Sequence, residues 1–128
     1  MVVKTARTVV ALMMALSVFA LAPHASAGTE VRRHGSCSDS STWKLKLKPD
    51  NGQLEVEFEV DSNVTGQTWG VKLFQNGDRI FRGHRTTHGA SGSFTLSVRA
   101  DDTAGTDAFR GRASNPDTGE ICVGRASI

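Results

Sequence analysis

Two histidines four residues apart, His84 and His88, have a spacing that can bind metal. On a helix, H-x-x-x-H sets both imidazoles on one face, where they can bind zinc. The surrounding Gly-His-Arg-Thr-Thr-His-Gly is rich in glycine and β-branched residues, which favours a strand or loop. In a strand, four residues span about 13 Å, too far for two bonds of about 2.0–2.1 Å to one ion. Only a folded-back loop, with His34 as a third ligand, would form a site, so the sequence predicts no metal site.

Other candidate catalytic groups lack the context that their chemistry needs. The acidic segment 101–107 lacks the spaced Asp/Asn/Gly pattern of a calcium loop. The segment 89–93 misses the G-x-S-x-G nucleophile motif because its fifth residue is serine. The glutamates of segment 55–59 are expected opposite lysines, without the environments that split carboxyl pKa values. The sequence therefore predicts no enzyme activity and no cofactor, and a metal-binding or hydrolytic protein using His84 and His88 remains an alternative.

A local excess of positive charge favours a binding function. Residues 79–99 contain four arginines and two histidines but no acidic residue. We expect Lys72, Arg82 and His84 to share an outer sheet face, with Arg85 as a further binding residue. Such a surface suits an anionic cell-wall polymer, a glycan or an acidic secreted protein. The alternative is that these arginines only protect an edge strand from aggregation.

The charge balance argues against a nucleic-acid partner. The whole chain has a formal net charge of +2. Lys4 and Arg7 account for it, because the other 13 Lys and Arg equal the 13 Asp and Glu. Without a net positive field, the electrostatic footprint of a nucleic-acid-binding protein is missing.

Residues 1–27 have the pattern of a cleaved secretory signal peptide. Lys4 and Arg7 precede the apolar run Val9–Ala22, and Ala25-Ser26-Ala27 gives a small-x-small cleavage site. The run is short for a membrane span, and the mature chain has no second one. We therefore expect a secreted protein with a signal peptide (1–27), a flexible N-terminal segment (28–41) and one domain (42–128).

The two cysteines, Cys37 and Cys122, are expected to form a disulfide, because an even pair in an exported protein is usually oxidised. A loop of about 85 residues closed in this way stabilises a fold by about 4–5 kcal/mol on the chain-entropy model. A redox or metal site is disfavoured, because there is no Cys-x-x-Cys and no flanking histidine.

Residues 42–60 predict a β-hairpin. Trp43, Leu45 and Leu47 alternate with lysines, and after Pro49-Asp50-Asn51-Gly52 the apolar residues alternate with glutamates. A turn centred on Asp50-Asn51 pairs Lys46 with Glu55 and Leu45 with Val56. Both faces agree on this register, which predicts a sheet with one buried face.

A second hairpin turns at Asn76-Gly77, and two registers are open. A two-residue turn pairs Leu73 with Ile80 and sends Arg82 and His84 to the core side. A three-residue turn pairs Val71 with Phe81 and directs Ile80, Arg82 and His84 outward. We favour the second, because burying an unpaired arginine costs more than exposing one isoleucine.

Seven short strands in total, with no helical period, predict an all-β, seven-stranded antiparallel β-sandwich. The further strands are expected at 68–74, after the Asn76-Gly77 turn, and at 93–99, 107–114 and 120–128. Trp69-x-Val71-x-Leu73 and Phe109-x-x-x-Ala113-x-Asn115 before Gly119 resemble the third, sixth and seventh strands of immunoglobulin-like and fibronectin type III-like domains. The chain departs from true immunoglobulin domains in its cysteine positions and in having no tyrosine. It also resembles small exported bacterial proteins of this build, a resemblance that implies no particular mechanism.

These observations favour a secreted, non-catalytic module with an extracellular binding or structural role. The expected contact surface is the third and fourth strands with the loop 86–92. A small secreted protease inhibitor is an alternative from another class. It requires a braced loop, and the glycine-rich segment 86–92 is expected to lack a brace.

Overall fold

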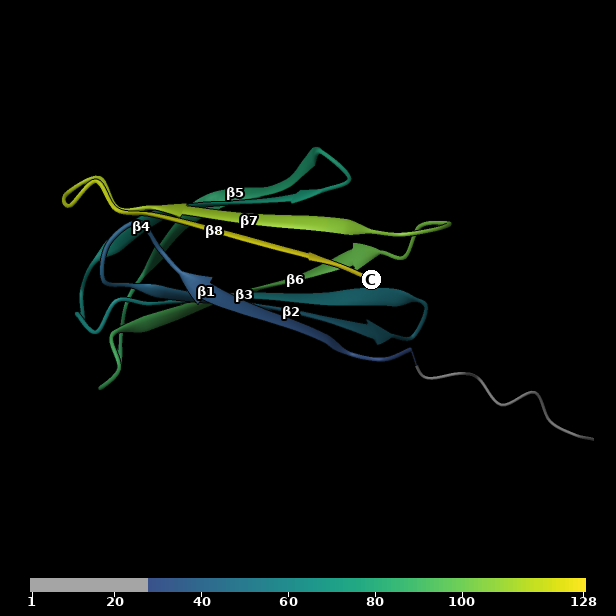
Figure 1. The fold of residues 1–128 in the computed structure, drawn as a ribbon, viewed down its shortest axis with the longest axis horizontal. Coiled ribbons are helices and arrows are strands. Elements are labelled where there is room, and N and C mark those ends of the chain that lie inside the picture. Colours follow the sequence, from purple (N-terminus) through teal and green to yellow (C-terminus); the bar gives the residue numbers. More distant parts are fainter. Residues whose placement is uncertain (1–27) are drawn as a thin grey trace, which may run out of the picture.

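The computed structural model describes residues 28–128, so the predicted signal peptide lies outside the described residues. These residues form two antiparallel four-stranded sheets, with strand orders β1-β2-β3-β6 and β5-β4-β7-β8. The two sheets lie as two layers (Figure 1), which confirms an all-β sandwich. The strands are β1 (Val31–Ser36), β2 (Thr42–Asp50), β3 (Gln53–Asp61), β4 (Thr68–Gln75), β5 (Asp78–Thr86), β6 (Ser93–Asp101), β7 (Ala108–Ser114) and β8 (Ile121–Ser127).

The prediction of seven strands is wrong, because β1 adds an eighth. This strand lies within the segment 28–41, which was expected to be flexible, and it pairs with β2 from Val31↔Leu47 to Ser36↔Thr42. Its sequence, VRRHGS, lacks the alternation of polar and apolar residues that identifies the other strands. An edge strand needs little apolar surface, since its partner strand supplies the hydrogen bonds.

The first hairpin forms, but its turn lies one residue later than predicted. Asn51 and Gly52 have φ values of 50° and 77°, the positive values that a two-residue type I′ turn requires. Lys46 therefore pairs with Glu57, not with Glu55. The pairing is displaced by two residues, and because the side-chain period is also two, every residue keeps its predicted face.

The second hairpin has a two-residue turn followed by a bulge, so the predicted three-residue turn is wrong. Asn76 and Gly77 form the turn with φ values of 50° and 87°. Leu73 pairs with Phe81, which leaves Ile80 as the extra residue. The bulge reverses the alternation, so Ile80, Arg82 and His84 are exposed as expected, although Val71 pairs with Gly83 instead of Phe81.

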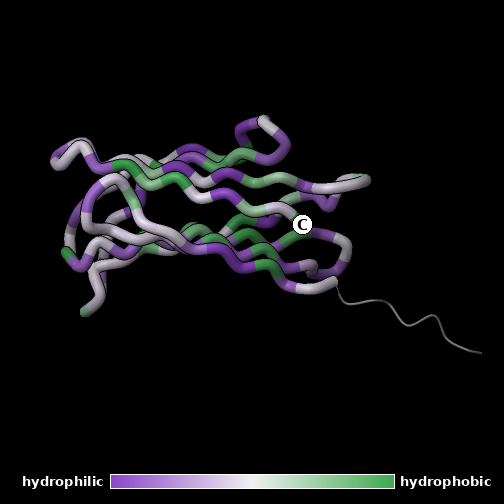
Figure 2. Tube along the Cα trace, viewed as in Figure 1, coloured by the Kyte–Doolittle hydropathy of each residue, from purple (hydrophilic) through white to green (hydrophobic). Residues whose placement is uncertain are grey.

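The core lies between the sheets and contains the apolar residues that alternate along the strands (Figure 2). Two aromatic side chains of the first sheet fill space left by glycines of the second. A Cβ at Gly111 would lie 2.7 Å from Cγ of Phe58, and one at Gly124 would lie 2.6 Å from Cε3 of Trp43. These two glycines pair across β7 and β8, so they allow the sheets to approach closely there.

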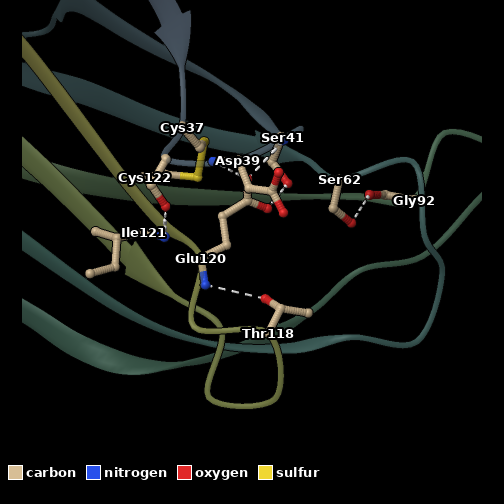
Figure 3. Close-up of a disulfide and its surroundings, with 10 residues drawn as sticks. Cys37, Asp39, Ser41, Ser62, Gly92, Thr118, Glu120, Ile121 and Cys122 are labelled. Carbon is tan, nitrogen blue, oxygen red and sulfur yellow. Dashed lines mark hydrogen bonds between the residues drawn. A yellow bond between two sulfur atoms is a disulfide. The ribbon is translucent and has the colours of Figure 1, made fainter.

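A disulfide and a buried carboxylate join the N-terminal segment to β8 (Figure 3). The predicted Cys37–Cys122 disulfide is present and links the end of β1 in one sheet to β8 in the other. Glu120 is buried, and its carboxylate accepts hydrogen bonds from the backbone N–H groups of Asp39 (3.0 Å) and Ser41 (2.9 Å). These contacts hold the turn after β1 in place.

A second buried carboxylate, Asp107, closes the opposite end of the sandwich. It accepts hydrogen bonds from backbone N and Oγ1 of Thr103 and from the side-chain amides of Gln75 and Asn76. Burial raises the pKa of Asp107, but the hydrogen bonds from Thr103, Gln75 and Asn76 together outweigh it, so the pKa is lowered.

Asp107→Asn is expected to lower the free energy of unfolding by about 1–3 kcal/mol at pH 7, because an amide nitrogen would face hydrogen-bond donors. A lowered pKa stabilises the fold at neutral pH, and this stabilisation is lost as the pH falls below about 4. The difference in the free energy of unfolding between Asp107→Asn and wild type should therefore be smaller at acidic pH than at pH 7. Urea unfolding at pH 7 and pH 3 measures it, with the exposed Asp102→Asn as control. Equal stability of Asp107→Asn and wild type at pH 7 would contradict this role.

Candidate anion-binding site

Six basic side chains occupy the outer face of the β5-β4-β7-β8 sheet, which we call the cationic face. Each occupies an outward position in the strand alternation, as in β7, where Arg110 and Arg112 alternate with the buried residues Phe109, Gly111 and Ala113. These four strands contain one acidic residue, Asp78, which is exposed at the hairpin end of β5 and pairs with the buried Gln75 at an inward position. The six residues are Lys72, Arg79, Arg82, Arg110, Arg112 and Arg125.

Strand register sets like charges directly opposite one another on this face. Lys72 of β4 pairs with Arg82 of β5 on one side and with Arg112 of β7 on the other. Arg110 of β7 pairs with Arg125 of β8. Like charges directly opposite in a sheet are destabilising, so folding alone does not favour this arrangement.

On the outer face of the other sheet, β2 and β3 place opposite charges across from one another. Lys44 and Lys46 lie across from Glu59 and Glu57, with Nζ–Oε distances of 3.4 and 2.7 Å. The hydrogen bond from Lys46 lowers the pKa of Glu57, and the same bond raises the pKa of Lys46. Across β2 and β3 the basic residues therefore have acidic partners, although Arg32 of β1 also lies opposite Lys46, whereas the six basic residues of the cationic face have no acidic partner across the strands.

The basic groups of the cationic face are available to a ligand. Within residues 28–128, none of the six makes an ion pair or a side-chain hydrogen bond to the protein. The guanidinium of Arg110 lies over the ring of Phe74 at 4.1 Å from its centroid, a contact that leaves its N–H groups unused. Each arginine presents five N–H donors and each lysine three.

Two shallow hollows lie on the cationic face, one toward each end of its strands. The first, of about 140 Å³, lies over Gly70 and includes Lys72, Arg82 and Arg112 in its lining. The second, of about 260 Å³, includes Arg110 and Arg125. A hollow of about 390 Å³ on the other sheet is lined by charges of both signs, including the paired lysines and glutamates.

The structure brings together three of the four predicted binding residues. Lys72, Arg82 and His84 lie on the cationic face. Arg85 occupies an inward position of β5, because it pairs with the buried Trp69. Its Nη1 donates to the carbonyl of His84 at 2.8 Å. Its guanidinium lies 5.0 Å from the ring centroid of Phe81. Arg85 is therefore not part of the cationic face.

The sequence does not identify four other members of the face, Arg79, Arg110, Arg112 and Arg125. The alternation of arginines with apolar and small residues in 109–113 was the available signal for two of them. It indicates that Arg110 and Arg112 point outward, but not that β7 lies beside β4. That neighbour relation joins strands far apart in the chain.

The three histidines weighed as metal ligands lie in different parts of the fold. His84 is on β5, His88 forms a bridge with Ser93 in the following loop, and His34 is on β1 in the other sheet. In the described part of the chain, no group of three or more His, Cys, Asp or Glu side chains is arranged to hold a metal ion.

The loop 86–92 is braced, so the expectation that it lacks support is wrong. Thr87 is buried, its N–H donates to the carbonyl of Gln67 at 2.8 Å, and its carbonyl accepts from the N–H of Gly66 at 2.7 Å. The hydroxyl of Thr65 donates to the carbonyl of Gly89 at 2.8 Å. These bonds join the loop to a segment twenty or more residues earlier, so they are not visible in the sequence.

Compared with protein families, with curated proteins and with solved structures, the chain matches none. No helix within residues 28–128 is long and apolar enough to cross a membrane. The Cys37–Cys122 disulfide suggests an oxidising, extracellular-type environment.

Proposed function

We propose that this protein is a secreted, non-catalytic binding module that holds an anionic extracellular polymer on its cationic face. The observation that carries this proposal is the register of like charges, in which Lys72 faces both Arg82 and Arg112 and Arg110 faces Arg125. An anion bound between these basic side chains would offset the repulsion between their like charges, which no acidic partner in the fold offsets. The signal-like residues 1–27 and the disulfide support secretion.

The dimensions of the face favour a polymer over a single small anion. Neighbouring strands lie about 4.8 Å apart, and successive outward residues lie about 6.8 Å apart along a strand. Six cations spread over four strands therefore cover an area of about 14 by 7 Å. A small anion contacts two or three of them at once, whereas a chain with repeated negative groups contacts them all.

An anionic glycan or cell-wall polymer fits better than nucleic acid. The positive charge is confined to one face, because the 13 basic and 13 acidic residues of 28–128 cancel overall. A stiff nucleic-acid duplex would extend beyond the face and meet the acidic residues of the rest of the molecule, whereas a flexible polymer can contact the face through a short segment.

The strand order supports an immunoglobulin-like or fibronectin type III-like form of the sandwich. The order β2-β3-β6 facing β5-β4-β7-β8 corresponds to strands A-B-E facing C′-C-F-G, with β1 as an added edge strand. On this assignment the cationic face lies on the four-stranded sheet C′-C-F-G. The bacterial origin implied by the sequence resemblance stays a prediction.

Chromatography of the purified protein on an immobilised anionic polysaccharide, beside a neutral dextran, tests the proposal. We expect retention on the anionic matrix only, with elution below about 1 M salt, where the Debye length falls to about 3 Å. Arg82→Gln should elute earlier than wild type, and Arg85→Gln, a matched control three residues along the same strand and on its other side, should elute with wild type. Elution that is the same on both matrices would overturn the proposal.

A protease inhibitor is a second candidate, because the loop 86–92 has the brace that such a protein requires. Its tip residues 88–91 are exposed. Incubation with a panel of serine proteases tests this candidate, and stoichiometric inhibition would rank it above polymer binding.

A further inference from the structure

We propose that the hollow over Gly70 is a subsite for one phosphomonoester group, such as a terminal or side-chain phosphate of the bound polymer. This inference rests on the proposed function and adds the chemistry of one ligand group. Gly70 pairs with His84 of β5 and with Ser114 of β7, so these two residues flank it on the same face. The next outward row is Arg82, Lys72 and Arg112.

Gly70 is a strand glycine that the packing of the protein does not explain. Five glycines lie within the strands of residues 28–128. At four of them a Cβ would lie within 3.0 Å of an aromatic side chain, so an aromatic ring needs the space. These four are Gly35, Gly83, Gly111 and Gly124.

At Gly70 a Cβ would meet only Ser114, with Oγ at 3.6 Å, an ordinary contact distance. Gly70 is also not among the residues with positive φ. Glycine weakens a strand interior and often marks a position where a ligand or another backbone approaches closely. A side chain here would fill the hollow of about 140 Å³, so we infer that Gly70 keeps space for a ligand.

The groups around the hollow match a phosphomonoester better than a carboxylate. Lys72, Arg82 and Arg112 supply three positive charges, and Ser114 adds a hydroxyl donor. A phosphomonoester carries about −1.5 to −2 charges at pH 7 and three strong acceptor oxygens. A carboxylate carries one charge and offsets a smaller part of the repulsion in this row. Arginine also binds phosphate oxygens through two parallel N–H groups.

An NMR titration of the ¹⁵N-labelled protein with inorganic phosphate tests this inference, with acetate and sulfate at matched ionic strength as comparisons. We compare wild type with Gly70→Val, which fills the hollow without changing charge and suits a strand. The matched control is Ser97→Val, an outward position on β6 of the other sheet. In parallel, the retention of all three proteins is measured on a column of an anionic polysaccharide that contains no phosphate groups.

The expected result is saturable shifts of the Gly70, His84 and Ser114 amides with phosphate. We expect affinity about tenfold weaker in Gly70→Val and unchanged in Ser97→Val. The column retention of all three proteins should be the same, because the six cations remain. Equal phosphate affinity in Gly70→Val and wild type, or stronger binding of acetate than of phosphate, would overturn the subsite and leave the polymer-binding function intact. If wild type shows neither phosphate shifts nor retention on the column, the subsite and the proposed function are both overturned.

Discussion

The double variant Lys72→Glu/Arg125→Glu is expected to bind an anionic polymer at least about a hundredfold more weakly than wild type at low salt, and yet to be more stable. Binding falls because two of six cations become anions, and each basic contact releases counterions from a linear polyanion. Stability rises because both substitutions turn like-charged neighbours into opposite-charged ones: Lys72 faces Arg82 and Arg112, and Arg125 faces Arg110. The three cross-strand pairs should each contribute about 0.2–1 kcal/mol to the increase in the free energy of unfolding. Calorimetric titration and urea unfolding measure the two effects.

The control for this variant is Lys44→Glu/Lys48→Glu, which changes net charge equally but on the other sheet. These lysines pair with Glu59 and Glu55, so the control should lose stability and keep most of its binding. Equal loss of binding in the two variants would show that net charge, not the cationic face, governs retention.

The second large effect is expected from Cys37→Ala/Cys122→Ala, which should lower the free energy of unfolding by about 2–5 kcal/mol. The bond closes a loop of 85 residues and joins an edge of one sheet to an edge of the other. For a domain of this size, 1 kcal/mol corresponds to about 4–8 °C in Tm, so the shift is large. Thermal unfolding followed by circular dichroism measures it.

Wild type in reducing agent should show the same fall in Tm as the double alanine variant. A variant that unfolds within about 2 °C of oxidised wild type would contradict the stabilising role given to this bond.

The sequence was sufficient for the parts of the fold that depend on local pattern. Alternation places Leu45, Phe58 and Trp69 in the core, and all three are fully buried. Asn-Gly marks both hairpin turns, since Asn51-Gly52 and Asn76-Gly77 have the positive φ values that this dipeptide accepts. The disulfide follows from an even cysteine count in a chain with a signal-like leader.

Features that depend on long-range neighbours could not be predicted in this way. The strand β1 has no apolar alternation and forms on the edge of β2. The bulge at Ile80 changes the face of the following residues without a marker in the sequence. For the same reason, only part of the candidate site was predictable: Lys72 and Arg82 are on one hairpin, whereas Arg112 reaches them only because β7 lies beside β4.

The salt dependence of binding tests the central claim most directly. We expect the logarithm of the association constant for a long inorganic polyphosphate to fall linearly with the logarithm of salt concentration. With six basic contacts, the slope in wild type should be about −4 to −5, and in Lys72→Glu/Arg125→Glu it should be smaller in magnitude by at least about two. A wild-type slope near zero, or an equal slope in the two proteins, would contradict binding through the cationic face.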